Sequence, residues 1–244
     1  MHALTPAQLL EVWELGMRQA NDQKALMLLR AALPEETWAS LAQCSIGRRN
    51  ALLLSVREGL FGSQFIGTAR CPACGEGLEL TFRTEDIRAA PTMKVAEPLT
   101  LEASDYQVSF RLPTSEDLAL MRGYEDAEVV ARLLLARCLL SARRYGEETS
   151  VEALPAEIVE AVEETMGQAD PQANIRLSLT CPGCGHHWLA GFDILTYVWK
   201  ELDAWARRVL REVHYLASAY GWSETDILNM RPWRRQIYLE MIGR

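Results

Sequence analysis

Two copies of one short phrase, Cys71-Pro-Ala-Cys74-Gly75 and Cys181-Pro-Gly-Cys184-Gly185, stand far apart in this sequence. In each copy a turn points two sulfurs inward, and the glycine that follows lets the backbone fold beneath them, which gives half of a tetrahedral metal site. Four thiolates leave no coordination position for water or substrate, so the ion would be structural and not catalytic. We therefore predict one structural Zn²⁺ bound by the four cysteines, Cys71, Cys74, Cys181 and Cys184.

The repeat extends beyond the cysteines. Alternating apolar residues indicate a strand with one buried face. They lie at the same offsets from the second cysteine of each pair, at Leu78, Leu80 and Phe82 and again at Trp188, Ala190 and Phe192. This pattern is typical of a zinc ribbon, here split into residues 63–82 and 175–192 by a long insertion.

Three other interpretations of these residues are open to a sequence of this kind. A thioredoxin-like dithiol would require a single Cys-x-x-Cys near a βαβ pattern, whereas this chain has two matched copies. Disulfides are disfavoured because no secretory signal is recognisable in residues 1–20. His186 and His187 follow the second pair, but with four cysteines at hand we interpret both as polar strand residues at the rim of the site. The spacing leaves open whether zinc or iron fills the site.

The composition indicates a soluble globular protein. Of the 244 residues, 49% are hydrophobic and 24% are charged. No apolar run approaches the roughly 18 residues that a membrane span requires, so we expect a cytoplasmic protein without membrane contact. The formal net charge of −8 disfavours a nucleic-acid-binding surface, which needs a basic face.

Most of the chain has the spacing of amphipathic helices, so we predict an α+β fold that is mainly helical. Residues 1–62 form an N-terminal helical region with three apolar stripes. Residues 193–244 begin with one helix of about 27 residues that follows Asp193 and stops at Gly221. Large aromatic residues crowd the short helices after it.

Residues 83–174 are predicted to form an inserted α/β domain. Apolar alternation on both sides of Ala103-Ser104-Asp105 indicates a β-hairpin. Residues 126–142 are apolar almost all round, so we expect a buried central helix there. Pro155 then opens an acidic helix before the chain returns to the second half of the ribbon. The lone Cys138 is expected to be a small core residue.

The aromatic C-terminus is a candidate partner-binding surface, because Trp, Tyr and Arg dominate binding hot spots and three arginines accompany these aromatics. The alternative is a helical hairpin whose aromatics are core residues. The candidate residues are Tyr220, Trp222, Ile227, Trp233, Ile237 and Tyr238. No nucleophile elbow, phosphate-binding glycine loop or HExxH motif occurs, so we expect no enzymatic activity.

With these residues laid out, the chain resembles a family of baseplate proteins of phage-like contractile injection systems, similar to a T-even-type phage baseplate hub assembly protein. The resemblance covers nearly the whole chain and depends on the order of four phrases more than on any one of them. They are residues 57–62 leading into the first cysteine pair, residues 110–114 with Asp117-Leu118, the second cysteine pair, and residues 212–223. Tyr220-Gly221-Trp222-Ser223 also resembles the ending of tail assembly chaperones that engage tape-measure proteins.

The resemblance implies a non-enzymatic assembly factor or structural component of the baseplate and hub, acting through protein–protein contacts. Its partner would be a baseplate, hub or tape-measure protein, and the chain would either leave or remain in the tail-like particle. The sequence departs from the small phage version by its zinc ribbon and its longer N-terminal helical region. A zinc-ribbon protein that binds nucleic acid or acts in transcription is the alternative.

Overall fold

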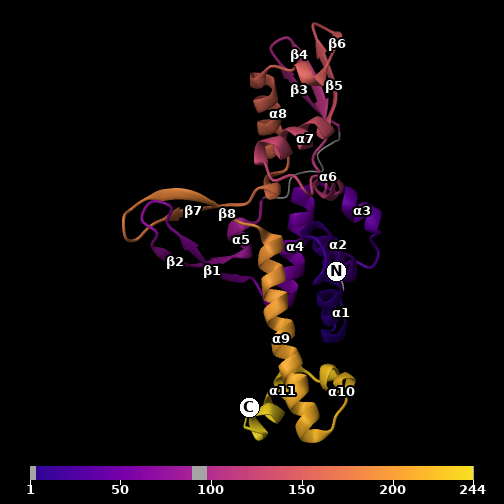
Figure 1. Ribbon diagram of the computed structural model, residues 1–244, viewed down its shortest axis with the longest axis vertical. Helices are drawn as coiled ribbons and strands as arrows, with labels where there is room; N and C mark the ends of the chain where they lie inside the picture. Colours follow the sequence, from indigo (N-terminus) through magenta and orange to yellow (C-terminus); the bar gives the residue numbers. More distant parts are fainter. Residues whose placement is uncertain (1–3, 90–97, 244) are drawn as a thin grey trace. The chain divides into compact units, whose positions relative to one another are not determined.

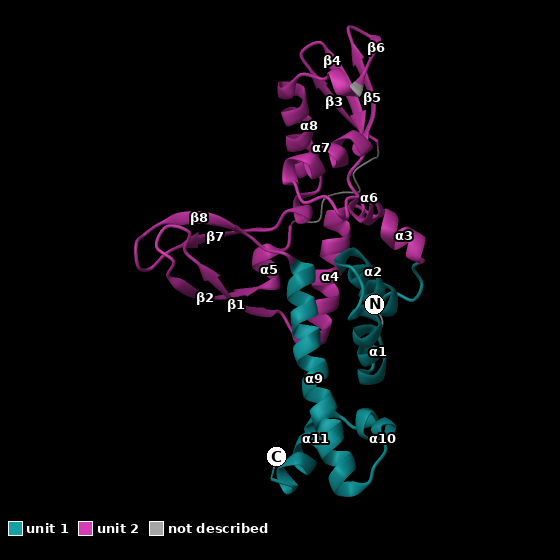
Figure 2. Ribbon diagram, viewed as in Figure 1, with its two compact units in different colours: residues 1–36, 194–244 teal, residues 37–193 magenta. Residues whose placement is uncertain are grey.

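The computed structural model describes residues 4–89 and 98–243, so the remaining residues of the predicted regions 1–62, 83–174 and 193–244 lie outside this description. The chain divides into two compact units (Figure 2). Unit 1 combines residues 1–36 with residues 194–244, and unit 2 comprises residues 37–193. The predicted N-terminal region 1–62 is thus divided after Glu36, and its first two helices pack with the long C-terminal helix of unit 1.

Unit 1 is helical over its described secondary structure. Thr5 starts the first helix with a capping box that involves Gln8. Trp13 donates its indole N–H to Asp203 at 3.0 Å, which joins the first helix to the long one. The five helices, shown in Figure 1, are α1 (Pro6–Gly16), α2 (Asn21–Ala32), α9 (Ile194–Tyr220), α10 (Glu224–Asn229) and α11 (Pro232–Met241).

The predicted long C-terminal helix is confirmed, since α9 has 27 residues. An apolar stripe along its whole length needs several partner helices to exclude water from it, and α1, α2, α10 and α11 supply them. The buried members of the stripe recur every three or four positions, at Ile194, Val198, Leu202, Ala206, Val209, Val213 and Leu216.

Over its described residues, unit 2 mixes helices with three small antiparallel sheets, in agreement with the α+β prediction. Two sheets are hairpins, β1 (Gln64–Arg70) with β2 (Gly77–Arg83) and β7 (Arg176–Thr180) with β8 (His187–Gly191). The third contains, in order, β3 (Leu99–Ala103), β4 (Tyr106–Phe110), β5 (Leu139–Arg144) and β6 (Glu147–Thr149). The helices are α3 (Trp38–Gln43), α4 (Ile46–Phe61), α5 (Thr84–Ile87), α6 (Ser115–Leu120), α7 (Ala127–Cys138) and α8 (Ala156–Ala169), with 3₁₀ turns at Val151–Ala153 and Pro171–Ala173.

The hairpin predicted around Ala103-Ser104-Asp105 is confirmed as β3 and β4, but the helix predicted over residues 126–142 is wrong in two respects. It ends at Cys138, and the residues after it form β5, which pairs with β4. It is also not a buried central helix, since Cys138 is its only buried residue. Pairing overrides the apolar pattern because Ala142 then packs opposite Val108 in the core that α8 covers.

A buried polar contact holds α4 against the 3₁₀ turn that leads back to β7. The Asp170 carboxylate accepts the N–H of Gly47 at 2.8 Å in the first turn of α4, where the helix dipole favours an anion. Two residues on, Gln172 accepts the N–H of Ala89 at 2.7 Å and donates to the carbonyl of Ile87 at 3.0 Å. The connection between the inserted segment and the second hairpin is therefore fixed by specific hydrogen bonds.

Gly47→Ala is expected to lower the free energy of unfolding by about 2 kcal/mol, the cost of overpacking a buried contact. A Cβ at this position would lie 1.9 Å from Oδ1 of Asp170 and 2.9 Å from the backbone nitrogen of Ala173. Gly59→Ala in the same helix is the control, because nothing lies within 4 Å of its added Cβ, and it should stabilise by about 0.5 kcal/mol. Urea unfolding followed by circular dichroism measures both, and equal midpoints would contradict the packing argument.

A second polar centre fixes the start of α6. The Asp117 side chain is 1% exposed. Its carboxylate accepts hydrogen bonds from both terminal nitrogens of Arg111, at 2.6 and 2.8 Å, and from Nε of Arg137 at 3.0 Å. It also accepts the N–H and hydroxyl of Thr114, each at 2.9 Å, which completes a capping box. Burial raises the pKa of Asp117, but these hydrogen bonds and the two guanidinium groups lower it more, so its pKa lies well below the usual range.

Asp117→Asn is expected to destabilise the protein by about 2 kcal/mol at neutral pH, since it weakens several hydrogen bonds to a charged acceptor. Because the folded state holds the pKa of Asp117 below its unfolded value of about 4, this stabilisation is present above that pH and is lost as the pH falls toward the folded pKa. The difference between variant and native protein should therefore shrink in acid. Glu116→Gln removes the same charge from an exposed neighbour and should change little. Denaturant titrations at neutral and acid pH measure the effect.

Candidate metal centre and partner-binding surface

The two cysteine turns have the same local structure. We call residues 71–75 the first knuckle and residues 181–185 the second knuckle. In the first, the N–H of Gly75 donates to the carbonyl of Cys71 at 2.9 Å, and in the second Gly185 donates to Cys181 at the same distance. Both glycines have positive φ, +77° and +72°, which other residues adopt at a cost. Each knuckle joins the two strands of its hairpin, so the hairpins present their sulfurs at corresponding positions.

The structure brings all four predicted cysteines together. Their sulfurs all lie within 4.8 Å of one another. Two of the separations between the knuckles are 3.7 Å, from Cys71 to Cys184, and 3.6 Å, from Cys74 to Cys181. Zn–S bonds of about 2.3 Å in a tetrahedron place sulfurs roughly 3.8 Å apart, whereas a disulfide needs about 2.05 Å. The donor set and its spacing therefore fit a tetrahedral metal ion.

The sulfurs influence one another's ionisation. Burial raises the pKa of the Cys71 thiol, but hydrogen bonds from the backbone N–H groups of Cys74 and Ala73 lower it to about 7. The N–H of Glu76 lowers the pKa of Cys74, but the adjacent sulfurs of Cys184 and Cys181 raise it to about 12. Thiolates this close repel one another, and a divalent cation at their centre would offset that repulsion.

Apolar residues shield one side of the cluster. Cys71 and Cys181 are buried, whereas Cys74 and Cys184 are exposed. Leu78 lies with the two buried cysteines in a small core against which Leu80 and Trp188 pack. This arrangement follows from the alternation predicted in the sequence.

Neither neighbouring histidine belongs to the four-sulfur group found among the described residues. His187 Nδ1 lies 2.8 Å from the hydroxyl of Thr180, and the ring of His186 stacks on Trp188. The prediction of polar strand residues is confirmed for His187, which begins β8, and is wrong for His186, which precedes that strand. Among the described residues the cysteines alone form the donor set.

Sequence reasoning missed a second connection between the hairpins, which we call the aromatic clamp. It consists of Phe65 on β1, Phe82 on β2 and Phe192 just after β8. Phe65 stacks on Phe82 at 4.9 Å between centroids, and Phe192 meets both rings edge-on, at 5.6 and 5.4 Å. The only signal was that Phe82 and Phe192 have the same offset from their knuckles.

The buried side chain of Arg57 supports the clamp. Its guanidinium lies 3.8 Å from the centroid of the Phe65 ring, and it donates to the carbonyls of Gly62 and Gln64, both at 2.6 Å. Arg57 thus connects α4 to the start of β1 by hydrogen bonds, and its guanidinium packs on the face of the Phe65 ring. An arginine inside a helix gave no sequence signal for this role.

The six aromatic and aliphatic residues proposed to bind a partner occupy different environments in unit 1. Tyr220, Trp222 and Tyr238 pack on one another, with Trp222 stacked on Tyr220 at 4.4 Å and edge-on to Tyr238 at 4.8 Å. Ile227 is 0% exposed, so it belongs to the core and not to a contact surface. Trp233 and Ile237 are 60% and 41% exposed.

Comparison with known proteins connects this architecture to a family. Among the described residues, no helix combines the length and apolar character needed to cross a membrane. Comparisons with curated proteins and with solved structures gave no match. A family model described as T4 bacteriophage base plate protein matches residues 19–193, a span that contains both knuckles and the aromatic clamp and ends where unit 2 ends. Because this match covers more than half of the chain, the protein belongs to the family of T4 bacteriophage base plate proteins.

Proposed function

We propose that the protein is a non-enzymatic assembly factor or structural component of the baseplate and hub of a phage-like contractile tail. The family match over residues 19–193 carries this proposal. Within the tail it acts by contact with another baseplate, hub or tape-measure protein. A nucleic-acid-binding role receives no support from the net charge of −8.

In this proposal the four cysteines bind one structural Zn²⁺ and hold the two hairpins together as the halves of a split zinc ribbon. The sulfur separations of 3.6 and 3.7 Å support this role. A closed site of four thiolates supplies folding free energy, because the unfolded chain has no preformed site. Metal analysis of the purified chain should find one zinc per molecule, and iron in its place would be recognised in the same measurement.

The exposed part of the C-terminal helices is the proposed partner-binding surface. Trp233 is its best probe, because its indole is exposed and Trp side chains dominate hot spots. Trp222 is a poorer probe, since its ring packs between Tyr220 and Tyr238 and its removal would also cost stability.

The test is co-purification of the tagged full chain with the baseplate and hub proteins produced in the same cells. Trp233→Ala should lower recovery of a baseplate protein at least about ten-fold while thermal stability stays unchanged. Trp38→Ala is the matched control, because Trp38 is 43% exposed but lies on α3 in unit 2. If the native chain retained no baseplate or hub protein, the proposed function would be wrong.

A further inference from the structure

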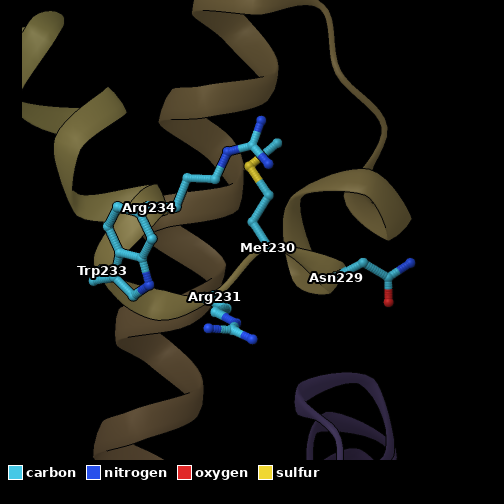
Figure 3. A pocket seen from close by; sticks show the side chains of 5 residues that line it. All are labelled: Asn229, Met230, Arg231, Trp233 and Arg234. Carbon is cyan, nitrogen blue, oxygen red and sulfur yellow. The ribbon is translucent and has the colours of Figure 1, made fainter.

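A pocket lies at the turn between α10 and α11 in unit 1. Its volume is about 550 Å³, which is in the range of sites that hold a ligand or a few side chains. Figure 3 shows five side chains radiating from this turn. We call the site the C-terminal pocket, and its lining residues are Asn229, Met230, Arg231, Trp233 and Arg234.

The C-terminal pocket carries positive charge that is not neutralised by the described part of the chain. No carboxylate among the described residues lies within ion-pair distance of Arg231 or Arg234. Two carboxylates of unit 1 have other partners. Glu212 accepts Nε of Arg235 at 3.0 Å, and Asp226 accepts the hydroxyl of Ser223 at 2.6 Å. Two guanidinium groups are therefore available to pair with an anion from outside the described chain, although the net charge of the protein is −8.

The same pocket offers apolar surface. The Trp233 side chain is 60% exposed, and the half-buried thioether of Met230 lies beside the turn. Arg234 is held near Tyr238, with its guanidinium carbon 5.7 Å from that ring centroid, so it is partly preorganised. A planar guanidinium binds a carboxylate through two parallel hydrogen bonds, and an exposed indole adds apolar contact area.

We propose that the C-terminal pocket binds an acidic segment of a partner protein. Carboxylates of that segment contact Arg231 and Arg234, and an adjacent apolar side chain packs on Trp233. Charge complementarity selects this occupant, since the free groups of the pocket are cationic. A nucleic acid fits less well, because its continuous run of phosphates needs a broad basic face, whereas the pocket offers two arginines on a chain whose net charge is −8. The inference rests on the proposed function and specifies the chemistry of its partner.

The experiment measures binding of short fluorescein-labelled peptides to the full-length protein by fluorescence anisotropy. One peptide consists of Leu, Ala and Glu, a second has Gln at every Glu position, and a third has Lys there. The native protein should bind the Glu peptide best. Arg231→Glu with Arg234→Glu should weaken that binding at least about ten-fold and should create binding of the Lys peptide. This reversal is a result that simple misfolding cannot produce.

The control is Arg132→Glu with Arg211→Glu, which makes the same charge change at two exposed residues that do not line the C-terminal pocket. Loss of Glu-peptide binding in this control, or equal binding of the Gln peptide, would overturn the inference. A single-stranded oligonucleotide that binds more tightly than the Glu peptide and displaces it would also overturn the inference. So would self-association of the native protein in light scattering, if only the Arg231/Arg234 variant lost it.

Co-purification separates this inference from the proposed function. If the Arg231/Arg234 variant still retains a baseplate or hub protein as well as the native chain does, the pocket is not the contact and the proposed function stands. If the native chain retains none but binds the Glu peptide as predicted, the pocket chemistry holds and the proposed function fails.

Discussion

Replacing both Cys74 and Cys184 with serine is expected to abolish metal binding and to unfold the two hairpins of unit 2. Each knuckle then keeps one thiolate, and a serine hydroxyl is too weak an acid to take the place of the other. Cys74 and Cys184 are the exposed members of the group, so the change removes little packing and isolates the effect of the metal. The structural zinc of small modules contributes on the order of 10 kcal/mol, which rivals the total stability of a domain.

The loss should lower Tm by at least about 15 °C for a chain of this size. Calorimetry gives Tm, elemental analysis gives the metal content, and hydrogen exchange should locate the lost protection in β1, β2, β7 and β8. Cys44→Ser is the matched control, because its thiol donates to the carbonyl of Leu41 at 3.1 Å outside the four-sulfur group, and serine preserves that bond. A double variant with native Tm, in a protein that binds no metal, would show that the centre is not a zinc site.

Phe65→Ala is expected to destabilise the protein by about 4 kcal/mol even with the metal bound. Phe65 is fully buried, and its ring meets Phe82, Phe192 and the guanidinium of Arg57. Its removal leaves a cavity between the hairpins, and the guanidinium of Arg57 loses its cation–π contact. The contact between the rings of Phe82 and Phe192 and the knuckles would then be left to join the two hairpins.

Ile66→Ala provides the control for this prediction. Ile66 is the next residue of β1, its side chain is 66% exposed on the other face, and its truncation should cost well under 1 kcal/mol. Chemical denaturation of both variants, with metal content checked in each, measures the difference. If Phe65→Ala were destabilised only when it had also lost its metal, the aromatic clamp would make no contribution of its own to stability.

The sequence predicted the local features of this protein well. The two knuckles, the hairpin at Ser104, the α9 helix and the candidate metal ligands were all visible in patterns of a few neighbouring residues. These features depend on turn residues and on periodicity, which act over short distances along the chain. The resemblance to baseplate proteins was likewise read from short phrases, and the family match confirms it.

Other features depend on contacts between distant residues and had no pattern of their own. The segment after Cys138 has a helical pattern but pairs with β4, because Ala142 gains a buried place opposite Val108. The aromatic clamp joins three rings from three strands or strand ends, and Arg57 supports it from a helix. The division of residues 1–62 between the two units also depends on which helices pack with α9.

The sequence alone determined which four sulfurs can bind one ion, because the Cys-x-x-Cys spacing and the following glycine set each turn locally. Only the tertiary structure decided that the two knuckles meet, with Cys71 3.7 Å from Cys184 and Cys74 3.6 Å from Cys181 between their sulfurs. It also decided that Ile227 is buried while Trp233 is exposed. The physical reason is that turn geometry is a property of a few consecutive residues, whereas burial and the meeting of distant side chains are settled by the packing of the whole unit.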